Sequence, residues 1–282
     1  NVNPVAQQLL RRLDGLGHAV GSHGGWVHDH FGNNASETNA TEFLPLLQWN
    51  EAAVNGAVGK SARSYSAPQG NNPLWAMDWL EQQGVVGAYF GGHTGLGATR
   101  QYRDGVLKNP ALYVFPVTPQ GLYATFEEFQ IYQVPKTNVI DWYRGLVDFS
   151  IAQNTSRLVY AHPPGANDWP DVLNNLLSYA GGKGAKFKWY TMPRLADFMT
   201  QRQQVVWTET ILATGATRFD ASHPTSLGEM VWMLPKNRYA KPVIVTSGGA
   251  VVANGGTVWL VKATAVKQLR FRALPNPTYV PA

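Results

Sequence analysis

Histidines gather near the N-terminus of the chain. Four of the seven lie between positions 18 and 30, namely His18, His23, His28 and His30. Neutral imidazole is a common ligand of zinc and similar ions. Two neighbouring histidines can hold one ion and leave coordination positions open for water and substrate. The alternative is a chance grouping of surface or core histidines. We favour a metal site because the segment follows a predicted strand, and α/β folds place their chemistry at strand ends.

Another histidine follows an apolar run at residues 157–161, which we predict to be a strand. His162 comes directly after it. An imidazole at that place can give and take protons near neutral pH. The alternative is a histidine that only caps the strand.

Several other chemistries are excluded by the sequence. The chain contains no cysteine, so thiol nucleophiles and cysteine zinc sites are excluded. No Gly-x-Ser-x-Gly motif is present, which argues against a serine esterase. A phosphate-binding loop ending at Gly59-Lys60-Ser61 would need glycine at position 54, where Val54 stands.

The elements that position these residues alternate between helix and strand over the first 200 residues. Apolar spacing and capping residues predict helices at 4–16, 42–58, 73–83, 141–153, 170–181 and 192–202. Strands are predicted at 18–22, 61–65, 85–90, 113–116, 157–161 and 186–191. Short β-rich runs follow at 205–213, 227–233, 242–247, 258–262 and 269–273. This pattern predicts an α/β domain over 1–202 and a small β-sandwich-like domain over 203–282.

The amino-acid composition indicates which classes of partner the chain can have. The chain has 282 residues, 44% of them hydrophobic and only 15% charged. Its 23 basic and 18 acidic residues give a net charge of +5 without a dense basic stretch, so we expect no nucleic-acid partner. No apolar run reaches the roughly 20 residues of a membrane span. Few charges and no cysteine favour an extracellular, periplasmic or cell-surface protein that handles polar ligands.

The histidine segment resembles a known motif. Gly17-His18-Ala19-Val20-Gly21-Ser22-His23, followed by another histidine, is similar to the second motif of the NodB-like polysaccharide deacetylases, carbohydrate esterase family 4. The family pattern is His-[Ser/Thr]-x-x-His. Here Val27 stands at the fourth position after His23, and His28 comes one residue later. The resemblance implies that His23 and His28 bind a divalent metal ion, which we expect to be Zn²⁺, with His30 as the substitute for His28.

Residues 67–71, Ala-Pro-Gln-Gly-Asn, resemble the family's third motif, Arg-x-Pro-Tyr-Gly, which lines the active-site groove. The resemblance assigns Pro68 and Gly70 to substrate binding and the backbone N–H of Gln69 to the oxyanion hole. Gln69 replaces the family tyrosine, and Ser66 stands at the arginine position, for which Arg63 is a candidate replacement. The alternative is an ordinary Pro-Gly turn.

The strand ending at His162 resembles the fifth motif, Leu-x-His, whose histidine protonates the leaving amine. Trp26 and Trp169 lie near these motifs and are expected to contact sugar rings, and Trp75 and Trp79 are weaker candidates. The family's catalytic Asp-Asp pair ends a strand that would precede residue 1. Its fourth motif has no clear match, although His93 and Asp104 lie in that region.

These resemblances, in the family's order, cover about residues 1 to 200. They imply a distorted (β/α) barrel of NodB type, N-terminally incomplete, followed by the sandwich-like domain. The implied function is a metal-dependent hydrolase that removes N-acetyl groups from amino sugars in a polysaccharide. The alternative is a catalytically inactive carbohydrate-binding module on a deacetylase fold, which the altered third motif and the missing Asp-Asp pair favour.

Overall fold

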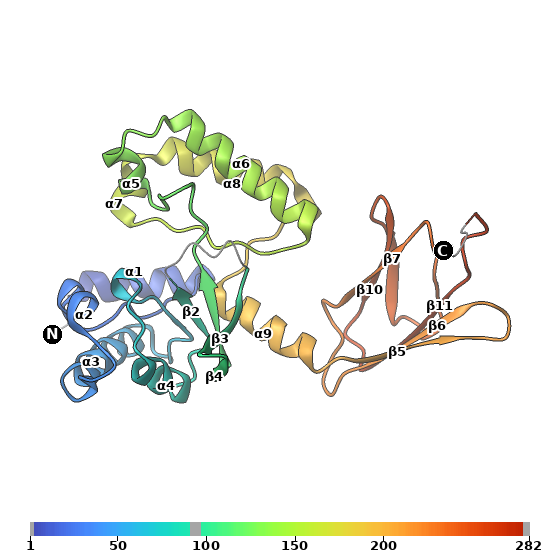
Figure 1. Cartoon of the computed structure of the whole chain (residues 1–282), viewed down its shortest axis with the longest axis horizontal. Helices are drawn as coiled ribbons and strands as arrows, with labels where there is room; N and C mark the ends of the chain where they lie inside the picture. The colour runs from blue at the N-terminus through green and yellow to red at the C-terminus, as the bar shows by residue number, and fades with distance from the viewer. Residues whose placement is uncertain (1–2, 91–96, 279–282) are drawn as a thin grey trace. The chain divides into compact units, whose positions relative to one another are not determined.

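The computed structural model describes residues 3–90 and 97–278. The chain divides into two compact units, Asn1–Asp197 and Phe198–Ala282 (Figure 1). This division falls inside helix α9 (Met192–Gln203), and the expected boundary between residues 202 and 203 lies in the same helix. The first unit mixes helices and strands, as the sequence predicts for an α/β fold.

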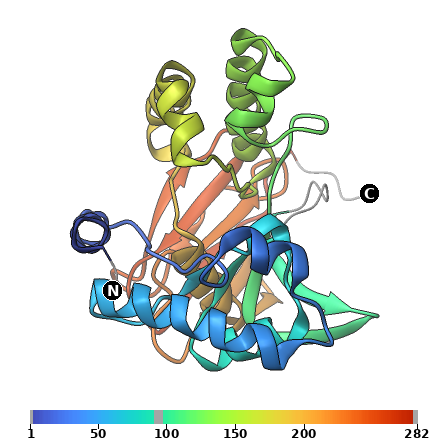
Figure 2. The ribbon, with the colours of Figure 1, turned by 90° about the vertical axis from the view of Figure 1, so that its left-hand side faces the viewer.

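Most predicted helices of the first unit are confirmed. They are α1 (Pro4–Gly15), α3 (Ala40–Val58), α4 (Leu74–Gln82), α6 (Lys136–Gln153) and α8 (Pro170–Gly182). The side chain of Asn3 accepts a hydrogen bond from the Val5 N–H and caps α1, with proline in the first turn. Gly59 ends α3 with a φ of 82°, a left-handed conformation that glycine adopts without strain. Figure 2 shows α3 along its length with α1 seen end-on beside it.

A four-stranded sheet lies at the centre of the first unit, in the order β1-β2-β4-β3. Its strands are β1 (Ser64–Tyr65), β2 (Gly87–Phe90), β3 (Thr99–Arg103) and β4 (Val106–Pro116). Strands β1, β2 and β4 are parallel, and β3 is antiparallel to β4. Two isolated parallel bridges extend this arrangement, Ser22 to Tyr65 on one side and Val117 to Leu158 on the other. Residues just after Ser22, Tyr65 and Leu158 therefore belong to the carboxyl edge of one parallel arrangement.

The closed barrel that the resemblance implies is not present among the described residues, where the sheet is open. The predicted strands 18–22 and 157–161 are reduced to the single bridges at Ser22 and Leu158. On the Leu158 side the Thr118 N–H donates to the Leu158 carbonyl, but Pro116, two residues earlier, provides no N–H with which the ladder could continue. The predicted strand 186–191 is also wrong. A short 3-10 helix, η2 (Gly184–Lys186), is followed there by irregular chain.

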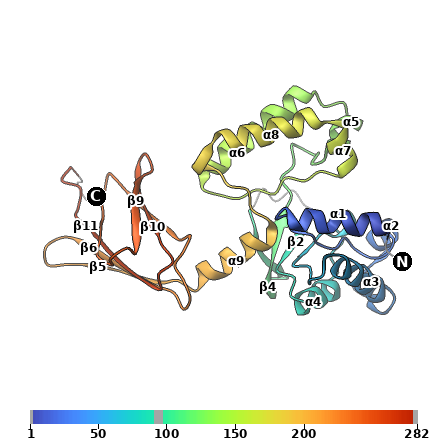
Figure 3. The same cartoon turned by 180° about the vertical axis from the view of Figure 1, so that it is seen from behind.

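The helices α5 (Phe126–Ile131), α6, α7 (Pro163–Asp168) and α8 enclose a hydrophobic cluster of their own. Buried residues of the cluster include Phe126, Phe129, Tyr143, Val172 and Leu176. Helices α6 and α8 lie side by side (Figures 1 and 3). Thr125 and Glu128 form a capping box that fixes the start of α5, and Glu127 lies in the same first turn.

A second cluster joins the sheet to α3 and α4. It contains Phe31, Phe43, Leu47, Tyr65 and Met77, all fully or almost fully buried. Phe31 belongs to the short helix α2 (His28–Asn34), which the sequence analysis did not predict. Because Phe31 and Gly32 are buried, α2 is anchored to the core, and this fixes the position of His28 at its first turn.

In the second unit, strands follow the end of α9. They are β5 (Val206–Ile211), β6 (Thr217–Ser222), β7 (Val231–Pro235), β8 (Val243–Ile244), β9 (Ala250–Asn254), β10 (Val258–Ala263) and β11 (Gln268–Ala273). They form two sheets, β5-β6-β11-β8 and β7-β10-β9 (Figure 3). Phe219 and Phe271 of one sheet and Leu234 and Val261 of the other contribute to one buried cluster. No helix in the described part of the chain has the length and apolar character needed to cross a membrane.

Candidate active site

His23 and His28 lie together in the structure. Their ring centroids are 4.7 Å apart, and the ring planes are tilted by 45°. His23 directly follows Ser22, whose bridge to Tyr65 attaches this segment to the sheet. The ring of His30 points elsewhere and lies 5.1 Å from the ring of Phe43.

The hydrogen bonds of the pair leave one nitrogen of each ring available. The Nδ1 of His23 lies 2.7 Å from the carbonyl oxygen of Ser66, and the Nδ1 of His28 lies 2.6 Å from Oδ1 of Asp29. Because these oxygens accept hydrogen bonds, each Nδ1 carries the proton and each Nε2 keeps its lone pair. Histidines that bind metals are commonly held in this way.

The donor set of this pair fits a divalent ion in part. Two imidazoles suit zinc, but a zinc site in a protein has three or four protein ligands. No group of three or more His, Asp or Glu side chains with a metal-binding arrangement is found among the described residues. Asp29 is already engaged through its contact with His28.

A cavity of about 450 Å³ adjoins the histidine pair. Trp26 lines it together with both histidines, and residues of α1 and α3 form its other walls. The Trp26 side chain is 58% exposed, which leaves its indole accessible to a ligand.

The Pro68–Gly70 segment packs directly against the histidine loop. Gly24, with a φ of +70°, lies so close to Pro68 that a Cβ there would be 2.1 Å from the proline Cγ. Gln69 has a φ of 53° in the short 3-10 helix η1 (Pro68–Gly70). The structure thus brings two of the sequence-predicted segments together, and Pro68 is buried where they meet.

His162 lies between two polar partners. Its Nδ1 is 3.2 Å from Oε2 of Glu127, and its Nε2 is 2.5 Å from the hydroxyl of Tyr160. Glu127 also accepts a hydrogen bond of 2.8 Å from the backbone N–H of Gly165. His162 precedes α7 as its N-cap, so the chain turns away from the sheet directly after this side chain.

The pKa values around His162 follow from these contacts. Burial alone would raise the pKa of Glu127, but its own backbone N–H, the His162 side chain and the Gly165 N–H together lower it. Burial raises the pKa of Tyr160 to about 12, with smaller contributions from Tyr89, Glu127 and Glu128. Near neutral pH the arrangement is therefore an ionised carboxylate, an imidazole and a protonated phenol in a row.

The two histidine sites are electrostatically coupled. Partial burial lowers the pKa of His23, the hydrogen bond with Ser66 opposes this shift, and the charges of His28 and His162 lower it further. His162 therefore lies within electrostatic range of the His23–His28 pair, although the chain separates them by more than a hundred residues.

Other sequence-predicted residues lie elsewhere. Trp169 packs against Phe126 at a centroid distance of 6.2 Å, with Lys136 over its ring, in the cluster of α5 to α8. The guanidinium of Arg63 forms a bidentate pair with Asp197 at 2.7 and 2.8 Å, so it is engaged with α9. Asp104 lies in the turn between β3 and β4, and His93 lies outside the described residues.

Sequence reasoning missed Glu127, Tyr160 and Gly165. Tyr160 stands two residues before His162, and alternation along an extended chain places both side chains on one side. Glu127 lies 35 residues earlier in a six-residue helix, where no periodic pattern marks it. The only local signal was the capping box that starts this helix.

Comparisons with known proteins concern the fold. No protein-family model matches the chain, and no curated protein matches it in sequence. A crystal structure described as a "putative polysaccharide deacetylase" from Mycobacterium smegmatis superimposes with a TM-score of 0.50 at 15% identity, over 70% of this chain and 68% of that chain. The fold is deacetylase-like. At this identity the similarity extends to the fold alone.

Proposed function

We propose that the chain is a metal-dependent hydrolase that removes N-acetyl groups from amino sugars in a polysaccharide. The observation that carries the proposal is the convergence of the His23–His28 pair, the Pro68–Gly70 segment and the Glu127–His162 pair at the carboxyl edge of the parallel strands. Except for Glu127, these are the residues and segments that the deacetylase resemblance names. The deacetylase-like fold supports the same conclusion.

The proposed metal would be held by His23 and His28 through their Nε2 atoms. When bound, a divalent ion such as zinc supplies Lewis-acid polarisation of the acetyl carbonyl. Further ligands are not assigned among the described residues, and neither is the base that would accept the proton of the attacking water.

The other residues act on the amide and its leaving group. The backbone N–H of Gln69 would donate a hydrogen bond to the oxygen that becomes negative when water adds to the acetyl carbon. As the C–N bond breaks, the amine nitrogen needs a proton, which His162 would supply. Ionised Glu127 holds the Nδ1–H of His162, so the Nε2 is the atom that can exchange a proton with the substrate. Tyr160 occupies that nitrogen in the structure, so its hydroxyl must either move aside or pass the proton on.

The proposal also includes the residues that contact the sugar and the compartment in which the protein acts. The exposed Trp26 lines the cavity beside the histidine pair and would contact the sugar. The resemblance gives the same role to Pro68 and Gly70, of which Pro68 is buried in η1. Trp169 is assigned to the helical cluster instead, because its ring packs against Phe126. A location outside the cytoplasm agrees with the absence of cysteine and the low charge of the chain.

Acetate release from N-acetylated chitooligosaccharides, measured with and without a chelator, tests the proposal. We expect chelator-sensitive release that falls by roughly 10²–10⁴-fold in His162→Gln, the usual size of lost acid catalysis. His18→Gln, at an exposed histidine of the same chain, should retain the activity. Equal release by the His162→Gln variant would exclude its role as the acid.

The second candidate is a carbohydrate-binding module without catalysis. It is favoured by the serine at position 66, where the family has arginine, and by the incomplete ligand set of the described residues. Oligosaccharide binding without acetate release in any metal would support this candidate against the first.

A further inference from the structure

The two units of the chain differ strongly in charge. Phe198–Ala282 contains nine Lys or Arg and only three Asp or Glu, whereas Asn1–Asp197 contains 14 and 15. The whole positive excess of the chain therefore lies in the second unit. A unit with this charge attracts anionic polymers and raises their rate of association.

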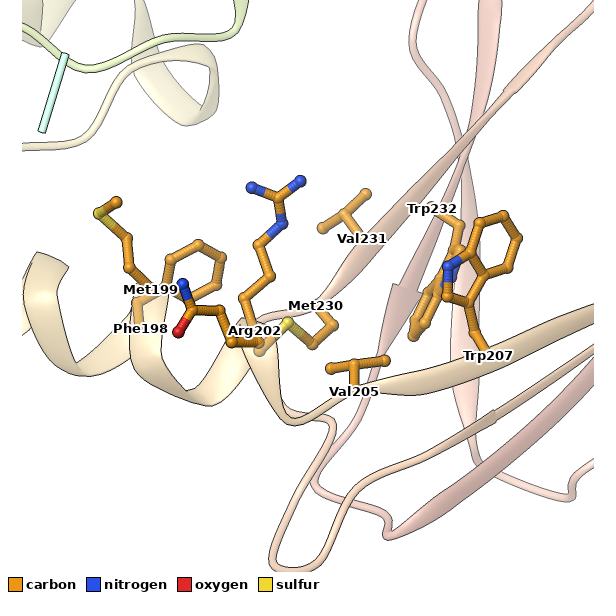
Figure 4. A pocket seen from close by; sticks show the side chains of 9 residues that line it. Phe198, Met199, Arg202, Val205, Trp207, Met230, Val231 and Trp232 are labelled. Atoms are coloured by element: carbon orange, nitrogen blue, oxygen red, sulfur yellow. The ribbon is translucent and has the colours of Figure 1, made fainter. Parts of the chain in front are cut away.

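The second unit also contains a pocket of about 470 Å³. Figure 4 shows it between the end of α9 on one side and strands β5 and β7 on the other. Its walls are apolar and aromatic, with Phe198 on α9, Met230 and Val231 at the start of β7, and two tryptophans from the two strands. Ligand pockets in proteins commonly have this size and a mainly apolar lining with a few polar groups.

The two tryptophans have different surroundings. Trp232 is half-buried and packs against Phe271 of the core at a centroid distance of 6.0 Å. Trp207 is 50% exposed on β5, the edge strand of its sheet. Trp232 therefore forms a fixed wall, while the indole of Trp207 offers an open apolar face to a ligand. The C–H face of a pyranose ring is an apolar surface of matching size, and its hydroxyl groups remain in water at the ring edge.

Arg202 supplies the positive charge of the pocket. Its side chain is exposed and extends from the last turn of α9 on the side of Val231 (Figure 4). Among the described residues that line the pocket it is the one charged side chain. The planar guanidinium matches a carboxylate in two-point hydrogen bonding better than lysine does.

We propose that this pocket binds a carboxylate-bearing sugar unit of an acidic polysaccharide, with the sugar ring on Trp207 and the carboxylate on Arg202. The positive charge of the second unit draws the polymer to the surface, and the pocket selects the sugar unit. Nucleic acid is the less suitable polyanion, because its binding depends on many phosphate contacts and the pocket offers one cation. The choice of a polysaccharide rests in part on the proposed function of the first unit, whose substrate is of that class.

The test uses the full chain and sodium polygalacturonate, a polymer of acidic sugars, in affinity electrophoresis and calorimetry. We expect binding that weakens about tenfold in Trp207→Ala, as befits the loss of one aromatic contact surface. The matched control is Trp49→Ala, which removes a tryptophan of similar exposure, 61%, from α3 of the first unit. Arg202→Gln should weaken binding similarly, whereas Arg12→Gln on exposed α1 should not.

Further arms of the test separate the possible outcomes. Neutral dextran should bind weakly, because it lacks the carboxylate. Unchanged polygalacturonate binding by folded Trp207→Ala would overturn the proposal. Equal binding of single-stranded DNA, also lost in Trp207→Ala, would overturn the choice of ligand. Acetate release from short chitooligosaccharides should stay normal in both pocket variants. If no acetate is released by the wild type or by any variant while the wild type still binds polygalacturonate, the proposed function is refuted and the assignment of the pocket still holds.

Discussion

The Nδ1 atom of His162 lies 3.2 Å from a carboxylate oxygen of Glu127, and the two residues are 35 positions apart in the chain. The capping box of α5 fixes the first turn of this helix, and the Gly165 N–H holds the other carboxylate oxygen. Glu127 is thus positioned from both sides. A carboxylate held in this way fixes the tautomer and the orientation of a histidine.

The first prediction concerns the charge of Glu127. Glu127→Gln retains the size of the side chain but removes the charge that holds the Nδ1 proton of His162. We expect acetate release to fall by roughly one to two orders of magnitude, less than the loss of the acid itself, because His162 is still present. The ¹⁵N NMR signals of His162 should show a changed tautomer, whereas the melting temperature should change little. An unchanged ¹⁵N spectrum together with full activity would show that the contact has no such role.

The second prediction concerns Gly165. A Cβ at this position would lie 2.4 Å from Oε1 and 2.5 Å from Cδ of Glu127, so alanine must push the carboxylate away from His162. Because the displaced group is the end of a flexible side chain, the fold should tolerate Gly165→Ala while activity falls as in Glu127→Gln. The double variant should be no worse than either single one, since both act through the same contact.

Gly145→Ala is the matched control for this prediction. Gly145 lies in α6 and has nothing within 4 Å of the added Cβ. Alanine there should keep the activity and stabilise the helix by up to about 1 kcal/mol. Full activity of Gly165→Ala would mean that Glu127 does not act on His162.

The third prediction concerns metal binding. His23→Ala and His28→Ala should each lower the affinity for Zn²⁺, measured by elemental analysis and by the absorption spectrum of a Co²⁺-substituted sample. His30→Ala should retain the metal, because its ring lies against Phe43 and away from the pair. Equal metal content in all three variants would refute the ligand assignment, and loss in His30→Ala alone would transfer it to His30.

Much of the first unit could be predicted from local signals. Asn3 with Pro4 marks the start of α1, and Gly59 marks the end of α3, because caps act within one turn. The segments after Ser22, Tyr65 and Leu158 could also be placed at one edge, since parallel strands end together. The side-chain roles assigned to these segments remain predictions.

The remaining features depend on contacts between distant segments. The predicted strand at 157–161 has suitable residues, but among the described residues it forms one bridge, beside Pro116 at the end of β4. Glu127 becomes a neighbour of His162 only because α5 and α7 pack together, and neither six-residue helix has a period long enough to detect. Strands β6 and β9 were missed for the same reason, since pairing rather than local propensity defines them.

The fourth prediction concerns Glu51, a carboxyl group buried between α3 and the sheet with only 2% exposure. Burial raises its pKa, and the side chains of Ser22 and Asn55 oppose this shift. Neither residue forms a hydrogen bond of good geometry with the carboxyl oxygens in the described part of the chain. Because the pKa of Glu51 is raised in the folded state, the protonated group contributes its full stability below the unfolded-state pKa of about 4.3. This contribution is lost as the pH rises through the folded-state pKa.

Glu51→Gln replaces the carboxyl by a group that never ionises. We expect the variant to melt higher than the wild type at pH 8, by about 2–4 °C for each kcal/mol gained, and equally at pH 4. The control Glu42→Gln, at an exposed position in the first turn of the same helix, should be neutral or slightly destabilising because it removes a favourable helix-dipole contact. A stability difference independent of pH would show that ionisation of Glu51 is not the cause.

The fifth prediction concerns Asp220 on β6, which pairs with Arg270 of β11 and with Arg218. The hydrogen bond from Arg270 lowers its pKa, burial opposes this, and Arg218 adds to the lowering. The stability from a lowered carboxyl pKa is present above the unfolded value of about 3.9 and is lost as pH falls through the folded value. Asp220→Asn should therefore destabilise the second unit by about 1 kcal/mol at pH 7, a modest amount for a partly exposed pair, and hardly at all at pH 2.

Amide hydrogen exchange in β6 and β11 at both pH values measures this local change in stability. The control is Asp171→Asn, which removes an exposed partner of Lys136 in the first unit and should leave these strands unchanged. Equal destabilisation at pH 7 and pH 2 would assign the effect of Asp220 to packing, because a contribution of its charge must vanish once the carboxyl group is protonated in both states.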